Sequence, residues 1–415
     1  MNDKALYAQI LGIVEPWYVE DVSIDFQAGT ITIKVDHKSD AGFSCPDCDR
    51  EGVIHDHRIR RWRHLDTCQL QTIIEANVPR VSCSDHGVHT AGVGWAEKNS
   101  RFTALFEGLV ISWLKEASIA AVAERLSLSW DEVDTIRGRA VARGLSRRKV
   151  VLVESICIDE TSFQKRHEYV TVLTDCAGDR VIDVLDNRGQ EALTTFLKAM
   201  PENHRQSIKA FTMDMWDPYI CAVRNVFDNW RRIICFDRFH VAQHFGKAVD
   251  KTRAMENREL LKEHGESVLT GTKFGWLRNA SLIDNRSRPS FMELARSALK
   301  TARAWAIKET AAQLWGYVSR TCAQKEWEKL LGWIRRCRLE SVIKVGNTIR
   351  TYLWGILNAI EMKVTNAKAE AINGRIQWIK KMACGFRNRE RFREAILFHL
   401  GGLDLMPKGS QISHH

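Results

Sequence analysis

Three acidic residues have the side-chain type and the sequence context that phosphodiester chemistry with two metal ions requires. Asp159 lies within the short apolar segment SICIDETSF, Asp214 follows the apolar segment KAFTM, and Glu370 lies in the polar segment NAKAEAINGRIQ. Two divalent cations held by carboxylates stabilise both the attacking and the leaving oxygen of a phosphodiester, and hard cations such as Mg²⁺ prefer oxygen ligands. These three acids are therefore predicted to be catalytic and to hold two Mg²⁺ or Mn²⁺ ions.

Glu370 shares one face of a predicted helix with three amide side chains. Asn366, Glu370, Asn373 and Gln377 are three or four residues apart, and this spacing places them on the same side of a helix. A polar stripe directed into the protein indicates a functional site, whereas a solvated helix face produces the same pattern. Aspartates at strand ends also commonly cap turns or helices. Each acid taken alone is therefore weak evidence.

Four further titratable residues lie close to these acids in the sequence. Glu160 and Asp217 adjoin Asp159 and Asp214, and are predicted to point to the other side of a strand or into the first turn of a helix. Asp237 and His240, in CFDRFH, close a further predicted strand. These two either lie beside the metal ions and orient water or phosphate, or form a strand-end cap with a packed histidine. The near-site role is favoured.

Two short cysteine motifs in the N-terminal region predict a structural zinc site. Cys45-Pro-Asp-Cys48 forms one knuckle and Cys83-Ser-Asp-His86 the second. Tetrahedral zinc takes four soft or borderline ligands, and two knuckles joined by a β-hairpin supply them. The alternative is a buried Cys83 and a surface His86. Other nitrogen ligands within reach along the sequence are His55, His57, His64 and His89.

Basic residues gather near both candidate sites. The formal charge of +10 favours phosphate-rich partners, because neutralised phosphates release counterions, although a surplus of charge also aids solubility. The basic residues form three clusters. The first lies between the two knuckles, the second in the third predicted helix and the residues that follow it, and the third after Glu370. The predicted DNA contacts there are Arg58, Arg60, Arg61, Arg63, Arg137, Arg139, Arg147, Arg148, Lys149, Lys380, Lys381 and Arg387.

The elements that must position these residues follow one another along the chain. Residues 20–95 alternate apolar and polar positions, which is typical of β-structure. Three helical segments between Phe102 and Val141 form a helix-turn-helix-like arrangement. From Ser155 to His240 the pattern predicts the order β, β, β, α, β, α, β, and residues 244–360 are helical almost throughout. Two more helices are predicted, near 366–381 and 390–400.

The predicted fold class is multidomain α+β. It combines a zinc-ribbon-like β domain, a helix-turn-helix and a ribonuclease H-like α/β core that an all-helical insertion interrupts. The predicted boundaries are 1–95 for the ribbon, 96–149 for the helix-turn-helix, 150–243 and 361–405 for the core, 244–360 for the insertion and 406–415 for a disordered tail.

Composition excludes several classes of protein. Hydrophobic residues make up 45% and charged residues 27% of the 415 positions, which is ordinary for a folded chain and excludes general disorder. No apolar run approaches the roughly 20 residues of a membrane span, and the first residues lack a secretory signal. A cytoplasmic location without a membrane is therefore expected. The eleven cysteines are expected to be reduced, and no disulfide framework is predicted.

The motifs together resemble a known family. CPDC with CSDH, ICIDETSF, FTMDMWDPYI, ICFDRFHV and NAKAEAINGRIQWIKKMACGFRN look like the L-three family of bacterial insertion-sequence transposases, over nearly the whole chain and in the family's order. The resemblance implies a DDE transposase in which Asp159, Asp214 and Glu370 are the three acids. It also assigns Asp237 and His240 to the family's Asp-x2-His signature. Many relatives have cysteine where His86 stands.

The resemblance further implies a reaction and its partners. Hydrolysis at the ends of the element would free 3′-hydroxyls, which then attack target DNA without a covalent protein intermediate. The ribbon and the helix-turn-helix would bind the terminal inverted repeats, with Arg137 or Arg139 in a major groove. A homodimer or higher oligomer on DNA is expected. The alternatives are a catalytically idle DNA-binding regulator and a ribonuclease H-like nuclease that does not transfer strands.

Overall fold

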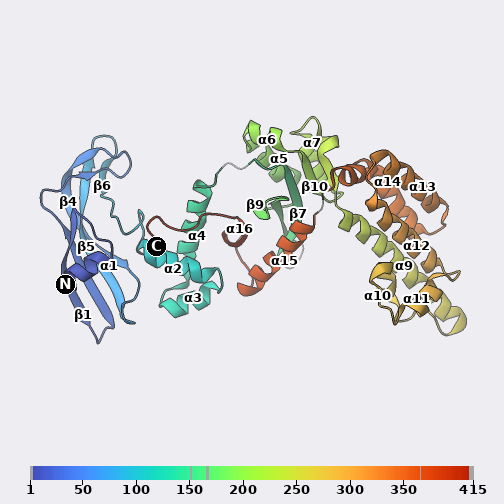
Figure 1. Cartoon of the computed structure of the whole chain (residues 1–415), viewed down its shortest axis with the longest axis horizontal. Coiled ribbons are helices and arrows are strands. Elements are labelled where there is room, and N and C mark those ends of the chain that lie inside the picture. The colour runs from blue at the N-terminus through green and yellow to red at the C-terminus, as the bar shows by residue number, and fades with distance from the viewer. Residues whose placement is uncertain (1–2, 150–151, 165–167, 365, 411–415) are drawn as a thin grey trace. The chain divides into compact units, whose positions relative to one another are not determined.

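The chain folds into two compact units in a computed structural model that describes residues 3–149, 152–164, 168–364 and 366–410. Unit 1 comprises residues 1–149 together with 403–415, and unit 2 comprises residues 150–402. Figure 1 shows β-structure and a small group of helices in unit 1, and a sheet with many helices in unit 2. Both units are α+β, as the sequence predicts.

A six-stranded sheet occupies most of the region where alternating residues predict strands. Its order is β1-β2-β5-β4-β3, and β6 pairs with β5. Only β2 and β5 run parallel among its described pairs. The inward-facing residues Ile33, Trp62 and Ile74 are at most 1% exposed. The strands are β1 (Trp17–Asp25), β2 (Thr30–His37), β3 (Phe43–Ser44), β4 (Glu51–Arg63), β5 (Gln71–Cys83) and β6 (Gly87–Thr90), and a helix that the sequence did not predict, α1 (Asp3–Ile10), packs on β1.

Three capped helices complete the N-terminal part of unit 1 and confirm the predicted trihelical arrangement. They are α2 (Ala104–Leu114), α3 (Ile119–Leu126) and α4 (Trp130–Ser146). Hydroxyl side chains accept backbone N–H bonds at each start, namely those of Thr103, Ser118 and Ser129. Glu132 completes a capping box with Ser129. The break between α3 and α4 therefore has a local cause in the sequence.

The end of the chain returns to these helices. Arg147, the C-cap residue of α4, donates to the carbonyl of Met406 at 2.6 Å, and Arg143 donates to the carbonyl of Leu405. Leu405 is 5% exposed, and Ser410 approaches Gly108 of α2. Residues 406–410 of the predicted disordered tail are therefore ordered by contacts, because Arg147 donates to the carbonyl of Met406 and Ser410 lies against Gly108. Residues 411–415 of that prediction lie outside the described residues.

A five-stranded mixed sheet is the framework of unit 2. Its order is β11-β10-β7-β8-β9, in which β7, β8 and β9 are antiparallel while β10 and β11 run parallel to β7. This is the predicted ribonuclease H-like arrangement with the predicted order of strands, although two helices and not one lie before β10 and again before β11. The strands are β7 (Ser155–Gln164), β8 (Glu168–Asp175), β9 (Arg180–Leu185), β10 (Ala210–Met213) and β11 (Ile234–Phe236); the helices between them are α5 (Gln190–Ala199), α6 (Glu202–Ser207), α7 (Asp217–Arg224) and α8 (Trp230–Ile233).

One cysteine pair departs from the expectation that all cysteines are reduced. Cys157 of β7 and Cys176, just after β8, form a disulfide with their Cα atoms 5.7 Å apart. The two residues are 19 positions apart in the sequence, and only the β7–β8 hairpin brings them together. Spacing along the chain carries no sign of this pairing.

A helical region separates the sheet from the last two helices, as predicted. One of its helices, α14, contacts the edge strand β11, where Asn358 donates to the carbonyl of Ile234 at 2.7 Å. Gly355 is required there because a Cβ would lie 2.5 Å from the ring of Phe236. The elements are α9 (Arg238–His264), α10 (Lys273–Leu277), η1 (Ala280–Leu282), α11 (Arg288–Ala295), α12 (Lys300–Gln313), η2 (Leu314–Gly316), α13 (Arg320–Arg336) and α14 (Glu340–Met362).

The last two helices return to the sheet. α15 (Ala367–Met382) contacts β7, and α16 (Arg389–Leu400) contacts β9; Figure 1 shows both red helices beside the green strands. The helix that carries Glu370 therefore packs against the strand that carries Asp159. Within the described residues, none of the helices is both long enough and apolar enough to span a bilayer.

Candidate active site and metal centre

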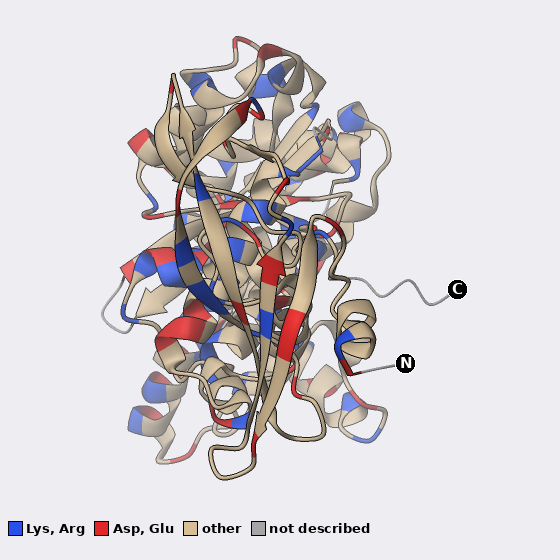
Figure 2. Cartoon of the chain, turned by 90° about the vertical axis from the view of Figure 1, so that its left-hand side faces the viewer, with Lys and Arg blue, Asp and Glu red and all other residues tan. Residues whose placement is uncertain are grey.

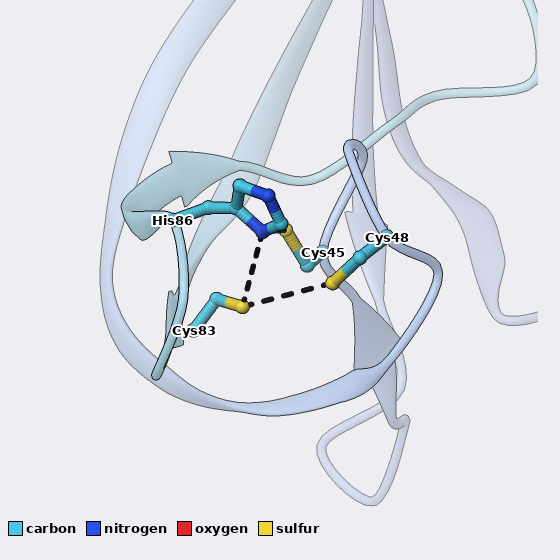
Figure 3. A group of neighbouring side chains, drawn as sticks. All are labelled: Cys45, Cys48, Cys83 and His86. Atoms are coloured by element: carbon cyan, nitrogen blue, oxygen red, sulfur yellow. Dashed lines mark hydrogen bonds between the residues drawn. The ribbon is translucent and has the colours of Figure 1, made fainter.

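The four predicted zinc ligands come together at one end of the N-terminal sheet. Cys45 and Cys48 lie in the turn between β3 and β4, Cys83 ends β5 and His86 precedes β6 (Figure 3). The Sγ atoms of Cys48 and Cys83 are 3.7 Å apart, and Nδ1 of His86 lies 3.6 Å from Sγ of Cys83. All four ligand atoms lie within 4.8 Å of one another.

These distances fit a tetrahedral zinc ion. Ligand atoms about 2.3 Å from a tetrahedral centre are about 3.8 Å apart, close to the 3.8 Å between Sγ of Cys45 and Nδ1 of His86. The backbone N–H of Asp85, followed by His86, lowers the pKa of the Cys83 thiol to about 6. The thiolate is the form that binds zinc. The cluster therefore fits a structural zinc, with His86 as the fourth ligand.

Strand register brings three aspartates to the same edge of the sheet in unit 2. Thr212 of β10 pairs with Cys157 of β7, so two residues further along Asp214 is level with Asp159. Met213 also pairs with Phe236 of β11, so Asp214 is level with Asp237. The backbone N–H of Asp237 donates to the carbonyl of Met213 at 3.1 Å. The prediction that adjacent strands unite Asp159 and Asp214 thus has a structural basis, and Asp237 joins them.

His240 lies against two of these acids. Its Nε2 atom is 2.7 Å from Oδ1 of Asp214 and 3.9 Å from Oδ2 of Asp237. The sequence predicted a strand through both Asp237 and His240, but β11 ends at Phe236 and Asp237 is the N-cap of α9. The turn from strand to helix is what directs His240 toward Asp214. The two residues lie among the acids, consistent with the near-site alternative.

Burial and neighbouring charges shift the pKa values of Asp159, Asp237 and His240 upward overall. Burial, and then the Asp214 and Asp237 carboxylates, raise the pKa of Asp159 to about 6, although the N–H of Glu160 and His240 oppose this. Burial also raises the pKa of Asp237. Burial lowers the pKa of His240, but the hydrogen bond and charge of Asp214 outweigh it and the net change is upward. Clustered acids with raised pKa values are typical of functional sites.

Glu370 lies at the margin of this group. It is in the first turn of α15, and burial followed by the charge of Asp237 raises its pKa. Its side chain is exposed. Among the described residues, only the cysteine and histidine set has three or more such ligand atoms within 4.8 Å of one another. The acids are therefore less closely gathered than the four residues of the cysteine and histidine set.

The chemistry of the donors fits divalent cations. Carboxylate oxygens are the ligands that Mg²⁺ and Mn²⁺ prefer. Three buried oxygens, one on an acid of this group and two on the amide stripe around Glu370, have no hydrogen-bond partner among the described residues. They are Oδ2 of Asp237, Oδ1 of Asn366 and Oδ1 of Asn373. An unpartnered buried oxygen costs about 1 to 3 kcal/mol, which a water or cation removes. Asp159, Asp214 and Glu370, with Asp237 nearby, would hold such ions.

The polar stripe around Glu370 faces the sheet. Nδ2 of Asn373 donates to Oδ2 of Asp159 at 2.7 Å, and Nε2 of Gln377 donates to Oγ1 of Thr161 at 3.2 Å. Asn366 is 2% exposed. The alternative of a solvated face is therefore wrong for Asn366 and Asn373, whereas Gln377 is exposed although it bonds Thr161. The neighbouring acids follow their predictions: Glu160 is 3.5 Å from Arg188, and Asp217 begins α7 and accepts from Tyr352.

Several predicted DNA contacts serve the fold instead. Arg137 is 4% exposed and pairs with Asp134 within α4, which places it inside the trihelical group and not in a groove. Arg139 pairs at 2.6 Å with Glu107, which is 1% exposed. Arg63 pairs with Asp66 and lies over the ring of Phe106. Lys380 donates to the carbonyl of Ser162 at 2.6 Å. Each of these four residues has a partner within the protein, which explains why it differs from the predicted DNA contact.

The remaining predicted contacts vary in exposure. Arg60 is half-buried over the ring of Trp62, Arg147 binds the C-terminal segment, and Arg148 is half-buried. Figure 2 shows both basic and acidic positions on the strands of the N-terminal sheet. Strands β2, β4 and β5 carry both signs of charge, whereas β1 carries only the acidic residues Glu20, Asp21 and Asp25. Five predicted contacts have exposed side chains: Arg58, Arg61, Lys149, Lys381 and Arg387.

Sequence reasoning missed a cation between two aromatic rings beside the acids. The guanidinium of Arg188 lies 5.0 Å from the ring of Tyr169 and 5.3 Å from that of Trp216, and it pairs with Glu160. Trp216 comes two residues after Asp214. Arg188 follows β9, and no motif in the sequence links it to the acids. Arg188 thus gives Glu160 an ion-pair partner, while the charge of Asp214 also acts on this carboxyl group.

Comparisons with known proteins agree with this arrangement. Residues 156–396 match the ISL3 transposase family model, residues 41–86 match the zinc-finger of transposase IS204/IS1001/IS1096/IS1165, and residues 93–136 match the helix-turn-helix domain of transposase family ISL3. The chain is similar to the transposase for insertion sequence element IS1001 of Bordetella parapertussis, with 23% identity over 82% of this chain and 84% of that protein. It is also 23% identical to the transposase for insertion sequence element IS1557 of Mycobacterium tuberculosis, over 97% of this chain and 96% of that protein.

The ISL3 family model covers more than half of the chain, and the three matched segments follow the order of the zinc cluster, the trihelical group and the acid-bearing sheet. This chain belongs to the ISL3 family of DDE transposases of bacterial insertion sequences.

Proposed function

We propose that this transposase cleaves DNA at the terminal inverted repeats of its insertion sequence and joins the freed 3′-hydroxyls to target DNA, with Asp159, Asp214 and Glu370 as the catalytic acids. The observation that carries the proposal is the register of β7, β10 and β11. It aligns Asp159 and Asp214 on adjacent strands, while α15, the helix of Glu370, contacts β7. The level positions of Asp159 and Asp214, together with the charge of Asp237 acting on Glu370, support a shared site.

Two Mg²⁺ or Mn²⁺ ions bound by these acids would activate the attacking oxygen and stabilise the leaving oxygen. The chain's own residues orient the acids for this task. The N–H of Glu160 and the amide of Asn373 hold the two oxygens of Asp159, and His240 holds Oδ1 of Asp214. Asp237 contributes a further buried carboxylate, whose charge acts on Asp159 and Glu370.

DNA binding follows from the helix-turn-helix and transposase domains. The proposed phosphate contacts are the exposed basic residues Arg58, Arg61, Lys149, Lys381 and Arg387. Phosphate contacts of this kind fix position on the duplex without reading its sequence. Binding two ends of an element requires two sets of these contacts, so we propose that two or more copies assemble on DNA.

The decisive experiment uses two neighbouring aspartates. Purified protein is incubated with Mg²⁺ or Mn²⁺ and labelled duplexes carrying the inverted repeats that flank its gene. D214N is expected to lose cleavage by on the order of a hundredfold or more, because a metal ligand is removed. D217N is the matched control, since Asp217 lies three residues on and bonds Tyr352; it should cleave as wild type does.

Each alternative function has its own outcome in this assay. A catalytically idle regulator would bind the ends and cleave none of them with any metal. A nuclease without strand transfer would yield nicked ends and no joined product. Equal cleavage by D214N and wild type would overturn the catalytic assignment.

A further inference from the structure

Side-chain hydrogen bonds fasten α15 to β7 residue by residue. Asn373 bonds Asp159, Gln377 bonds Thr161, and Lys380 bonds both the carbonyl and the hydroxyl of Ser162. The donors are spaced by one helical turn, and their acceptors follow in order along the strand. The helix of Glu370 is therefore held on β7 in one register by polar contacts as well as by packing.

Asn373 differs from the other donors because its partner is an acid. Nδ2 of Asn373 lies 2.7 Å from Oδ2 of Asp159, and the backbone N–H of Glu160 lies 2.7 Å from Oδ1. An ionised carboxylate only accepts hydrogen bonds, so the amide nitrogen and not the amide oxygen must face it. Each carboxylate oxygen thus has one fixed donor and keeps a lone pair for a further partner.

The placement of these two donors limits the orientation of Asp159. A carboxylate with a single donor rotates about its last bond, whereas donors on both oxygens fix its plane. The second donor comes from α15, the same helix that carries Glu370 one turn earlier. The orientation of one acid is therefore coupled to the docking of the helix that bears another.

We propose that Asn373 is a positioning residue for Asp159, which it holds in the orientation that binds a divalent cation. The proposal rests on the proposed function, because it assumes that Asp159 is a metal ligand. Groups that hydrogen-bond to a ligating carboxylate contribute about 10- to 100-fold to metal affinity. Asn373 also couples ligand orientation to helix docking, so that α15 completes the metal site when it is seated on β7.

The test measures Mn²⁺ binding by the full chain without DNA, from the electron paramagnetic resonance signal of free Mn²⁺. N373L removes the donor at similar side-chain volume and is expected to weaken Mn²⁺ binding by about tenfold or more. Q377L is the matched control, because it removes an amide on the same helix face that bonds Thr161 and no acid. Q377L is expected to bind Mn²⁺ as tightly as wild type does.

Thermal melting without metal establishes that the variants are folded. If N373L does not fold, N373S takes its place, since a serine hydroxyl is too short to reach Asp159 and the same loss of affinity is expected. Wild-type Mn²⁺ affinity in a folded Asn373 variant overturns the proposal. Equal weakening by N373L and Q377L overturns it as well, because Asn373 would then act only through helix docking.

The proposed function fails in a different way. D159N is expected to lose both Mn²⁺ binding and DNA cleavage. If D159N retains both, Asp159 is not a metal ligand and the catalytic assignment falls, whatever N373L does. If D159N loses both while N373L matches wild type, only the positioning role of Asn373 is overturned.

Discussion

Nε2 of His240 lies 2.7 Å from Oδ1 of Asp214, so the first turn of α9 is bonded to the residue that follows β10. Two segments that adjoin neighbouring parallel strands are thereby joined beside the acids. The bond needs a proton on Nε2, which either a neutral ring with Nε2–H or a charged ring supplies; burial lowers the pKa of His240, but the hydrogen bond and charge of Asp214 outweigh it. His240 therefore orients Asp214 in the way that Asn373 orients Asp159.

Loss of His240 should slow cleavage without abolishing it. H240A leaves Oδ1 of Asp214 without its donor, and a rate lower by about 10- to 100-fold is expected from the loss of one orienting group. H240Q should recover part of this loss, because its amide nitrogen reaches a similar position. The measurement is the single-turnover rate of cleavage at saturating Mg²⁺. H244A, one turn further along α9, is the control; a wild-type rate for H240A contradicts the role.

Glu370 should be required for cleavage and nearly neutral for stability. Its side chain is exposed, so E370Q is expected to change the free energy of unfolding by no more than about 0.5 kcal/mol. Removal of a metal ligand should nevertheless lower cleavage by on the order of a hundredfold. Strand cleavage and thermal melting measured on one preparation check both parts.

Glu390 provides the control for that experiment, because it also lies in the first turn of a helix, α16. E390Q should cleave as wild type does. If E370Q retains full activity while D237N loses it, Asp237 and not Glu370 is the third acid. The alignment of Asp237 with Asp214 makes this the outcome to examine first.

Zinc should be bound by the four-residue cluster with one ion per chain. C48A removes one of four ligands, and metal analysis is expected to find no zinc above background in that variant. Because metal-binding free energy contributes directly to folding, the ribbon should lose several kcal/mol of stability. C68A is the control, since Cys68 is an exposed free cysteine outside the cluster. Absence of zinc from wild-type protein that retains all four ligands would refute the assignment.

Acid should destabilise unit 1 through His64. Burial, followed by the charge of Arg63, lowers the pKa of His64 from its ordinary value of 6.5 to about 4. The folded unit therefore keeps this ring neutral, while the unfolded chain takes up a proton below pH 6.5. Its stabilising contribution is full above pH 6.5 and is lost as the pH falls towards 4, by up to about 3 kcal/mol.

The pH dependence is measured by hydrogen exchange in β5 and α2 at pH 5 and pH 7. H64N keeps a donor or acceptor for Thr103, whose hydroxyl lies 2.9 Å from Nδ1 of His64, but it does not titrate. The variant should therefore show a smaller loss of protection at pH 5 than wild type. H55N, at an exposed position on β4, should behave as wild type does. An equal loss in H64N and wild type contradicts the prediction.

The sequence predicted those features that depend on local pattern. Helical spacing of apolar residues located α2, α3 and α4, and apolar runs located the strands that carry Asp159 and precede Asp214. The zinc ligands were predicted because a knuckle fixes two ligands within one turn of chain. Periodicity also identified the amide stripe on α15, although it could not decide between a buried face and a solvated one.

Features that depend on contacts between distant segments were not predictable in the same way. Arg139 and Lys380 are basic residues in basic segments, and only the fold reveals that Glu107 and Ser162 engage them. The disulfide between Cys157 and Cys176 depends on how the β7 and β8 hairpin is paired. The alignment of Asp237 with Asp214 follows from strand register, which a single sequence does not specify.

Residues 403–410 pack with α2 and α4, so unit 1 is assembled from two pieces of chain with the whole of unit 2 between them. During synthesis the first 149 residues leave the ribosome long before their last contacts do. Arg143 and Arg147 must wait for the carbonyls of Leu405 and Met406 until more than 250 further residues have been translated. Unit 1 therefore completes its contacts only after the segments of unit 2 that carry Asp159, Asp214 and Glu370 have been translated.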